Sequence, residues 1–227
     1  MYDLLIFGVA FFISVALSTL FIVRPNLLMS PEHMLRDLTA PQAQHTCPTP
    51  RVGGIGIILG LSVGCVFYTN DIGRDLLFAL SAGVVVFWAG LLEDIYRNVS
   101  PRNRLFAAFI SAALAIGVTG SLVPDLGLTE GALLEWVVPA IVITLLWSAG
   151  TCHALNLVDG LNGLSALYSM VASIGFIAIA GQTGDTDIQI VAGLLSVAIF
   201  GFFILNWPFG RIFLGDAGAY GIGHILA

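Results

Sequence analysis

Residues 188–205, IQIVAGLLSVAIFGFFIL, contain no aspartate, glutamate, lysine or arginine and are apolar along nearly their whole length. A helix needs roughly 17–25 residues of this kind to cross about 30 Å of hydrocarbon. Further stretches without these four residue types cover 4–23, 52–70, 76–92, 105–123, 136–152 and 164–180, and an eighth begins at Ala217 and reaches Ala227. The sequence therefore predicts an all-α, polytopic transmembrane bundle with seven full spans and a truncated eighth.

The composition of the chain also indicates a membrane protein. Of the 227 residues, 58% are hydrophobic and 10% are charged, whereas an ordinary soluble domain carries about 25% charged residues. No stretch of the chain has the composition of a soluble domain. We therefore expect residues 1–227 to form a single integral membrane domain.

The arginines predict the orientation of the chain in the membrane. The chain has no lysine, and its eight basic residues are all arginines. If the loop 24–51 faces the cytoplasm, all of them except Arg74 lie on the cytoplasmic side, and this bias predicts an N-terminus outside. The net charge of −6 then reflects acidic outer loops and gives no indication of a nucleic-acid partner.

The distribution of ionisable residues separates classes of function. Proton-coupled transporters and pumps place carboxylates or histidines at mid-membrane, whereas here only His224, in the eighth stretch, lies at such a depth. The polar residues gather instead in segments on the cytoplasmic side. This distribution favours an enzyme that joins a water-soluble substrate to a lipid-borne one.

The first of these segments contains HTCPTPRVGG, residues 45–54. Arg51 offers a planar cation that suits phosphate, and Gly53 and Gly54 let a ligand approach the backbone closely. The alternative is a rigid entry into the second span, with Arg51 as a cytoplasmic anchor.

The second segment contains GLLEDIYRNVSPRNR, residues 90–104. Glu93 and Asp94 stand side by side at a membrane exit, where two acids are costly unless a cation neutralises them. Mg²⁺ prefers one or two carboxylates together with substrate phosphates. The alternative is that both acids only solvate the end of a helix.

The third segment contains HALNLVDGLNGL, residues 153–164. On a helix Asn156 and Asp159 share a face, as do Asp159 and Asn162. Such a strip presents a carboxylate and amides to a sugar, a base or a metal. A helix cap would explain Asp159 but not the other residues.

The fourth segment contains NWPFGRIFLGDAGAYGIG, residues 206–223. Asp216 stands at the start of the eighth span, and Arg211 lies five residues before it. Aspartate is a common cap at a helix N-terminus. Because a helix N-terminus also favours phosphate, a cap and a metal ligand do not exclude each other.

Together the segments PTPRVGG, GLLEDIYRNVSPRNRL, NLVDGLNGL and RIFLGDAG resemble, in order, the signatures of the polyprenyl-phosphate N-acetylhexosamine-1-phosphate transferases. This family, glycosyltransferase family 4, includes undecaprenyl-phosphate N-acetylglucosamine-1-phosphate transferases and phospho-N-acetylmuramoyl-pentapeptide transferases. The resemblance implies transfer of a sugar-1-phosphate from a UDP-sugar to undecaprenyl phosphate, with release of UMP. It is closer to the branch that initiates the O-antigen of lipopolysaccharide.

The resemblance also implies roles for individual residues. Asp216 would be the principal ligand of Mg²⁺, or of Mn²⁺ in its place, and Asp159 would be a second metal contact. Glu93 and Asp94 would orient or deprotonate the lipid phosphate, and Asp159 would be the third catalytic residue. The substrate-binding residues would be Arg51, Asn156, Asn162 and Arg211.

By the same resemblance we expect a multi-pass protein of the bacterial inner (cytoplasmic) membrane with its active site on the cytoplasmic face. Its partners would be the UDP-sugar, polyprenyl phosphate and membrane lipid, with no nucleic acid and with a homodimer as a candidate assembly. The paired aspartates of the family appear here as Glu93-Asp94, and Asn162 is also a departure from the family pattern. A non-catalytic membrane scaffold of the same family is therefore one alternative function. A transporter of a lipid-linked sugar is the other, although the spans without ionisable residues disfavour it.

The length of the last stretch leads to one more expectation. As a helix, residues 217–227 would rise only about 16 Å, which is half the hydrocarbon thickness. The family continues through further spans beyond this point. We therefore expect the chain to be incomplete at its C-terminus, and the 227 residues alone to bind Mg²⁺–UDP weakly and to show little or no transfer.

Overall fold

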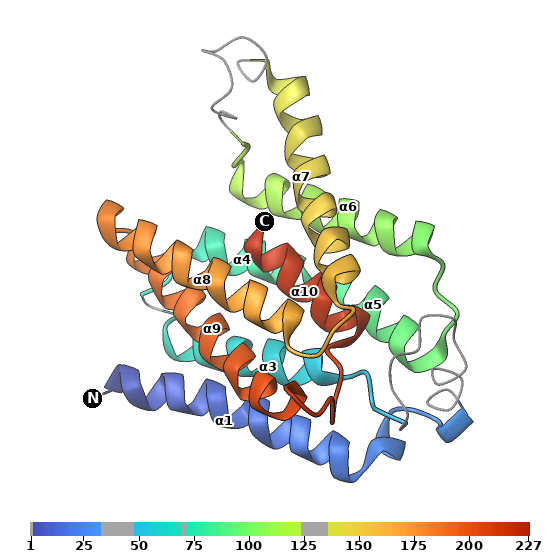
Figure 1. The fold of residues 1–227 in the computed structure, drawn as a ribbon. Coiled ribbons are helices and arrows are strands. Elements are labelled where there is room, and N and C mark those ends of the chain that lie inside the picture. The colour runs from blue at the N-terminus through green and yellow to red at the C-terminus, as the bar shows by residue number, and fades with distance from the viewer. Residues whose placement is uncertain (1, 33–47, 70, 124–135) are drawn as a thin grey trace.

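The computed structural model describes residues 2–32, 48–69, 71–123 and 136–227, and every regular element in these ranges is helical (Figure 1). The elements are α1 (Tyr2–Val23), the 3-10 helix η1 (Pro25–Leu27), α3 (Gly53–Phe67), α4 (Arg74–Ala82), α5 (Val84–Tyr96), α6 (Pro101–Thr119), α7 (Val137–Val158), α8 (Leu164–Thr183), α9 (Thr186–Asn206) and α10 (Gly215–Leu226). The prediction of an all-α protein is confirmed for this part of the chain.

Five helical segments within the described ranges are long and apolar enough to cross a membrane: Asp3–Val23, Arg74–Tyr96, Val137–Val158, Leu164–Thr183 and Thr186–Asn206. Each corresponds to one of the stretches predicted as spans. The predicted stretch 52–70 forms α3, a shorter apolar helix of 15 residues. The stretch 105–123 belongs to α6, which starts earlier, at Pro101, and carries Arg102 and Arg104 near its N-terminus.

Local sequence sets where several helices begin. Ser100 caps α6, because its hydroxyl oxygen accepts a hydrogen bond from the backbone N–H of Asn103 at 3.2 Å, and Pro101 occupies the first turn. Asp185 caps α9 in the same way, through the N–H of Ile188 at 3.1 Å. Such caps satisfy backbone donors that have no partner inside the helix.

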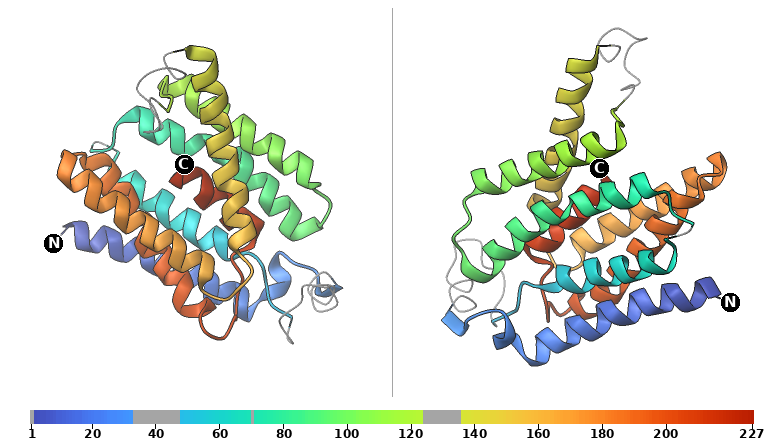
Figure 2. Two further views of the ribbon diagram at one scale, coloured as in Figure 1. Left: turned by 45° about the horizontal axis from the view of Figure 1, so that its top comes forward. Right: turned by 180° about the vertical axis from the view of Figure 1, so that it is seen from behind.

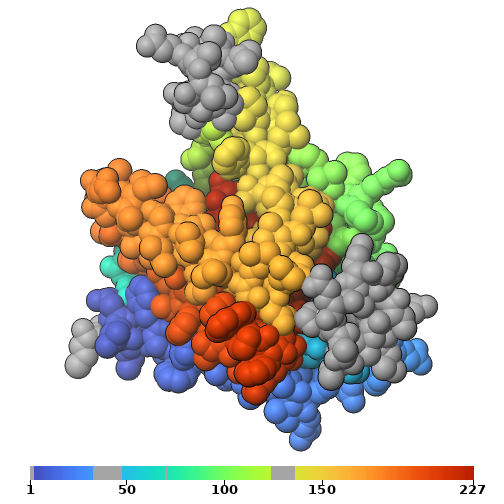
Figure 3. Space-filling model, viewed as in Figure 1, coloured from blue at the N-terminus to red at the C-terminus, as the bar shows by residue number. Residues whose placement is uncertain are grey.

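Helix α10 runs through the interior of the bundle and packs against α3, α5 and α7 (Figures 1 and 2). All of its residues from Gly215 to His224 are buried. Helices α1, α3 and α9 pack against one another, and α8 packs along α9. The first half of α7 extends beyond the other helices, as the space-filling view also shows (Figure 3). The start of α10 is therefore enclosed by elements from distant parts of the chain.

Glycines let α3 and α5 approach α10 backbone to backbone. A Cβ at Gly54 would lie 2.2 Å from the Cα of Gly218, and a Cβ at Gly90 would lie 2.6 Å from the backbone nitrogen of Ala217. No side chain fits at either position without moving a helix. Small residues of this kind allow close packing of membrane helices, and here they bring α3 and α5 to the first turn of α10.

We expect Gly54→Ala to lower the thermal stability of the protein in detergent. The added methyl group would overlap backbone rather than a flexible side chain, and overpacking costs about 1–3 kcal/mol. Gly117→Ala is the matched control, because nothing lies within 4 Å of a Cβ at Gly117 in α6. Equal melting temperatures for the two variants would contradict the packing of α3 on α10.

The predicted stretch 76–92 is interrupted at Gly83, which separates α4 from α5. Side chains from other helices bind backbone groups near the break. The N–H of Val86 donates to Ser111 Oγ at 3.1 Å, and the carbonyl oxygen of Ala79 lies 2.9 Å from Nε2 of His224. Such partners allow a helix to break at membrane depth. His224, the ionisable residue of the eighth stretch, therefore packs against this break.

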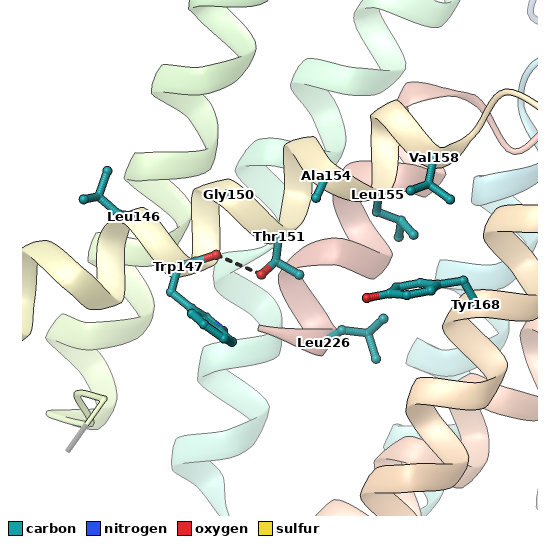
Figure 4. Close-up of a pocket in the computed structure, with 9 residues that line it drawn as sticks. All are labelled: Leu146, Trp147, Gly150, Thr151, Ala154, Leu155, Val158, Tyr168 and Leu226. Carbon is teal, nitrogen blue, oxygen red and sulfur yellow. Dashed lines mark hydrogen bonds between the residues drawn. The ribbon is translucent and has the colours of Figure 1, made fainter. Parts of the chain in front are cut away.

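An apolar pocket of about 450 Å³ lies between α7, α8 and the end of α10 (Figure 4). The residues that line it are Leu146, Trp147, Gly150, Thr151, Ala154, Leu155, Val158, Tyr168 and Leu226. The residues of α7 that contact polar groups of α10 lie on the opposite face of that helix, since Cys152 Sγ is 3.5 Å from the carbonyl oxygen of Tyr220 and Asn156 bonds to Asp216. Helix α7 thus separates an apolar pocket from a polar cluster.

Candidate active site

Backbone pairing brings the segment around Arg51 to the start of α10. The N–H of Phe213 donates to the carbonyl oxygen of Pro50 at 2.8 Å, and the N–H groups of Gly53 and Gly54 donate to the carbonyl oxygens of Phe213 and Leu214, both at 2.9 Å. Gly215 follows with a φ of +77°, a conformation that favours glycine. These contacts place Arg51 beside Asp216 although the two lie 165 positions apart in the sequence.

Asp94 of α5 caps α10 from outside the helix. Its Oδ1 accepts a hydrogen bond from the N–H of Asp216, and its Oδ2 accepts one from the N–H of Ala217, both at 2.9 Å. The N-cap residue itself, Leu214, provides no side-chain cap. The side chain of Asp94 is only 1% exposed, so its charge is compensated by these N–H groups, by the helix dipole and by Arg51, whose Nε lies 4.0 Å away.

The carboxylate of Asp216 is the point at which the side chains of the cluster meet. Its Oδ1 accepts from Asn156 Nδ2 at 3.0 Å and lies 3.5 Å from Arg51 Nη2, while its Oδ2 pairs with Arg104 Nη1. Asp216 lies one residue inside the helix and does not occupy the N-cap position. The expectation that Asp216 is the N-cap of this helix is therefore wrong: the N-cap position is Leu214, and the side-chain cap is supplied by Asp94, which accepts from the N–H groups of Asp216 and Ala217.

Arg104 belongs to this cluster, and sequence reasoning assigned it no role. It lies in the first turns of α6, where the cap at Ser100 fixes the start of the helix, and its guanidinium carbon lies 5.9 Å from the centre of the Tyr220 ring. The available signal was the end of the motif NVSPRNR, in which Arg102 and Arg104 are separated by one residue. Arg102 is exposed and Arg104 is half-buried, a difference that only the packing of α6 decides.

Asp159 lies at the edge of the cluster. Helix α7 ends at Val158, and Oδ1 of Asp159 accepts a hydrogen bond from Ser165 Oγ at 2.8 Å. Burial raises the pKa of Asp159 above its usual value, and the Ser165 hydrogen bond and the charge of Arg51 oppose this effect. Asp159 is thus within electrostatic reach of Arg51.

Asn162 lies in the turn after α7 and not on a continued helical strip, because the chain turns at Gly163 with a φ of +80°. The predicted helical face shared by Asp159 and Asn162 is therefore wrong. Nδ2 of Asn162 donates to the carbonyl oxygen of Pro208 at 3.2 Å. Asn206, which the sequence did not single out, joins the same loops: its Oδ1 accepts from the N–H of Gly163 at 2.6 Å, and its Nδ2 donates to the carbonyl oxygen of Ile212 at 2.7 Å.

Arg211 contacts an aromatic ring and not the Asp216 cluster. Its guanidinium carbon lies 5.4 Å from the ring centre of Phe209, and both residues are exposed. Attraction between a cation and an aromatic face is worth about 0.5–1 kcal/mol at an exposed site. The role of Arg211 in substrate binding stays a prediction.

Glu93 is half-buried at the end of α5. Its Oε2 accepts a hydrogen bond from the N–H of Val99 at 2.8 Å. The turn that this contact holds includes Arg97, which has a φ of +56°. Glu93 therefore has a structural contact, and its predicted action on a lipid phosphate requires a test that separates charge from reach.

Two substitutions at Glu93 distinguish the effect of its charge from the effect of its reach. Glu93→Gln keeps an oxygen that can accept from Val99 but removes the charge, whereas Glu93→Asp keeps the charge but is one methylene too short for the same contact. If the charge acts on the lipid phosphate, we expect Glu93→Gln to lower the transfer rate about a hundredfold, and Glu93→Asp to lower it far less. The opposite order in initial rates would assign Glu93 to the turn alone.

The donor set of the cluster fits Mg²⁺ bound together with a substrate phosphate. Within the described ranges, no group of three His, Cys, Asp or Glu side chains is placed to hold a metal ion by itself. Mg²⁺ does not need such a cage, because one or two carboxylates, waters and substrate phosphates suffice. In this cluster, the carboxylate of Asp216 is the one best suited to serve as such a protein ligand.

Buried donors in the same cluster suit an anion. In the described part of the chain, Arg51 Nε, Arg104 Nε and His153 Nε2 are buried without a hydrogen-bond partner. Unsatisfied buried donors are rare and often mark a ligand position. Charged donors bind phosphate oxygens strongly, so the cluster combines a metal-type acceptor with phosphate-type donors.

Comparisons with known proteins agree with this chemistry. A family model described as "Glycosyl transferase family 4" matches residues 76–227. The chain is 30% identical over 207 residues to the decaprenyl-phosphate N-acetylglucosaminephosphotransferase of Mycobacterium tuberculosis. The matched region covers 81% of the chain and 50% of that protein. It is 27% identical over 233 residues to the phospho-N-acetylmuramoyl-pentapeptide-transferase of Bacillus licheniformis, and this matched region covers 95% of the chain and 70% of that protein.

A third relative is a Bacillus subtilis protein named "Probable undecaprenyl-phosphate N-acetylglucosaminyl 1-phosphate transferase", 29% identical over 196 residues, or 84% of the chain and 53% of that protein. The chain spans about half the length of the N-acetylglucosamine-phosphate transferases that it matches, between 50% and 56%. The family model itself covers well over half of the chain, and the three relatives all carry names of transferases. The chain therefore belongs to glycosyl transferase family 4.

Proposed function

We propose that the protein transfers an N-acetylhexosamine-1-phosphate from a UDP-sugar to a polyprenyl phosphate, undecaprenyl phosphate in bacteria, and releases UMP. The observation that carries this proposal is the convergence of Arg51, Arg104 and Asn156 on the buried carboxylate of Asp216. Phosphoryl transfer depends mainly on positioning and on neutralising the charge of phosphate oxygens. A cluster of this composition provides both, and the transferase names of the relatives give the chemistry its substrate class.

In the proposed reaction, an oxygen of the lipid phosphate attacks the β-phosphorus of the UDP-sugar. The bond between the β-phosphorus and the bridging oxygen breaks, and UMP leaves with that oxygen. Arg51 and Arg104 bind phosphate oxygens, and Asp216, with Asp159 as a second ligand, would hold Mg²⁺, or Mn²⁺ in its place. Charge on the pyrophosphate would be neutralised by the bound metal. Asn156, Asn162 and Arg211 contact the substrate.

The two carboxylates of α5 have different surroundings, and this difference supports different roles for them in the reaction. Glu93 is half-buried, whereas Asp94 is almost fully buried with both oxygens bound to backbone N–H groups. We assign to Glu93 the orientation or deprotonation of the lipid phosphate. Asp94 contributes by fixing the start of α10, and thereby Asp216, beside that phosphate.

We further propose that the active site faces the cytoplasm of a bacterial inner membrane, with the N-terminus outside and with α3, α6 and α10 completing seven full spans and an eighth. The distribution of arginines supports this orientation, because Arg51 and Arg104 of the cluster lie on the arginine-rich side. The proposal includes a homodimer as the assembly and the initiation of a cell-surface polysaccharide such as O-antigen as the pathway.

The proposal is tested with membranes that contain the protein expressed from its complete gene. A panel of UDP-sugars is supplied with undecaprenyl phosphate and Mg²⁺, and released nucleotide is separated by chromatography. We expect UMP from a UDP-N-acetylhexosamine only when both the lipid phosphate and the metal are present. Movement of a preformed lipid-linked sugar across the membrane without UMP would favour a transporter, and neither result with correctly inserted protein would favour a scaffold.

A further inference from the structure

We propose that Arg104 is an internal cation that competes with Mg²⁺ for Asp216 and turns to the substrate phosphate when the metal is bound. The inference rests on the proposed function, because it takes Asp216 as the metal ligand. It assigns to Arg104 two successive partners, the Asp216 carboxylate before metal binding and a phosphate oxygen afterwards.

The charges around Asp216 make a competition necessary. Both oxygens of its carboxylate are already engaged, Oδ1 by Asn156 and Arg51 and Oδ2 by Arg104. In the nearby carboxylate of Asp94, both oxygens already accept hydrogen bonds from backbone N–H groups. A divalent cation at Asp216 would therefore meet two guanidinium groups at short range, where like charges repel strongly because the surroundings are of low polarity. One of the two arginines has to move before the metal binds.

The surroundings of the two arginines indicate that Arg104 is the one that moves. Arg51 is held by its own segment, since its neighbours Pro50, Gly53 and Gly54 are paired with residues 213–214, and it is an ion-pair partner of both Asp94 and Asp216. Arg104 reaches Asp216 from the first turns of α6 by its side chain alone. The acidic partner of Arg104 is the carboxylate of Asp216.

Tyr220 supplies the second position for Arg104. The guanidinium carbon lies 5.9 Å from the centre of the Tyr220 ring, and attraction to an aromatic face does not fix a single orientation of the group. The Nε of Arg104 is buried without a hydrogen-bond partner. The guanidinium can therefore leave Asp216 while it stays over the ring, and it has donors to offer to a phosphate.

The test measures Mn²⁺ binding to the purified protein by electron paramagnetic resonance, with Asp216→Asn to define the signal from other sites. We expect Arg104→Gln to bind Mn²⁺ about tenfold more tightly than the unchanged protein, since the charged hydrogen bond from Arg104 to Asp216 no longer opposes the metal. Arg102→Gln is the matched control, because it removes the same charge two residues away from an exposed position, and it should leave the affinity unchanged.

A second readout uses UDP binding with the metal removed by EDTA. Here Arg104→Gln is expected to weaken binding, so that metal affinity and nucleotide affinity change in opposite directions. Arg104→Met, which keeps an apolar stem against Tyr220, should behave like Arg104→Gln and replaces it if that variant does not fold. Unchanged or weaker Mn²⁺ binding in both variants would overturn the competition. If Mn²⁺ binding is the same in the unchanged protein and in Asp216→Asn, the metal site of the proposed function fails instead.

Discussion

Asp216→Asn is expected to lower sugar-phosphate transfer by more than about a hundredfold, the usual effect of removing an electrostatic group that acts on the transition state. Asparagine is nearly isosteric, and the backbone N–H groups of Asp216 and Ala217 would still be capped by Asp94. The amount of folded protein in the membrane should therefore change little. Initial rates of UMP release, with protein amounts measured on the same membranes, give the result.

The control for this variant is Asp185→Asn. Asp185 caps α9 at an exposed position, and asparagine is as good a cap as aspartate, so turnover should be normal. Near-normal turnover in Asp216→Asn would reduce Asp216 to a partner of the two arginines. Loss of the folded protein would instead show that its charge is needed to balance Arg51 and Arg104.

Asp94→Ala is expected to have the largest effect on stability. The substitution leaves the N–H groups of Asp216 and Ala217 without their acceptor in a buried position, at a cost of about 1–3 kcal/mol for each group. It also leaves Arg51 with one ion-pair partner fewer. The stability of Asp94→Asn should lie between that of the unchanged protein and that of Asp94→Ala, because its amide has one oxygen that can accept. Melting temperatures in detergent give the order of the three proteins.

The comparison for this prediction is Asp185→Ala, which removes an exposed cap of α9 and should cost about 1 kcal/mol. If Asp94→Ala is no more destabilising than Asp185→Ala, Asp94 does not hold the start of α10. If it is inactive at unchanged stability, Asp94 acts directly on a substrate, as the resemblance of GLLEDIYRNVSPRNRL to the family implied.

Composition and spacing predicted the helices because membrane helices are determined by their own apolar residues. The stretch 188–205 lies within α9, and the stretch 4–23 lies entirely within α1. The break at Gly83 was not predicted, because its backbone partners are Ser111 and His224, which lie in other helices. The strip from Asn156 to Asn162 was extended too far, because the helix that carries Asn156 ends at Val158.

For the site, the motifs identified the segments but not the pairings between them. Arg51, Asn156 and Asp216 were chosen by residue type and are brought together by the fold. The capping of α10 by Asp94 joins residues 122 positions apart, so no local pattern could reveal it. Arg104 looked equivalent to Arg102 in sequence. Only the contacts of Arg104 with Asp216 and Tyr220 of α10 distinguish them.

The most direct test of the central claim follows the β-phosphorus of the donor. The protein, expressed from its complete gene in membranes, is supplied with UDP-N-acetylglucosamine labelled with ³²P at the β-position, undecaprenyl phosphate and Mg²⁺. The proposed transfer of sugar-1-phosphate predicts that the label moves into the organic-soluble lipid while unlabelled UMP is released, and that Asp216→Asn abolishes both. Release of labelled UDP, with the sugar alone in the lipid, or no labelled lipid with any UDP-N-acetylhexosamine, would contradict the account.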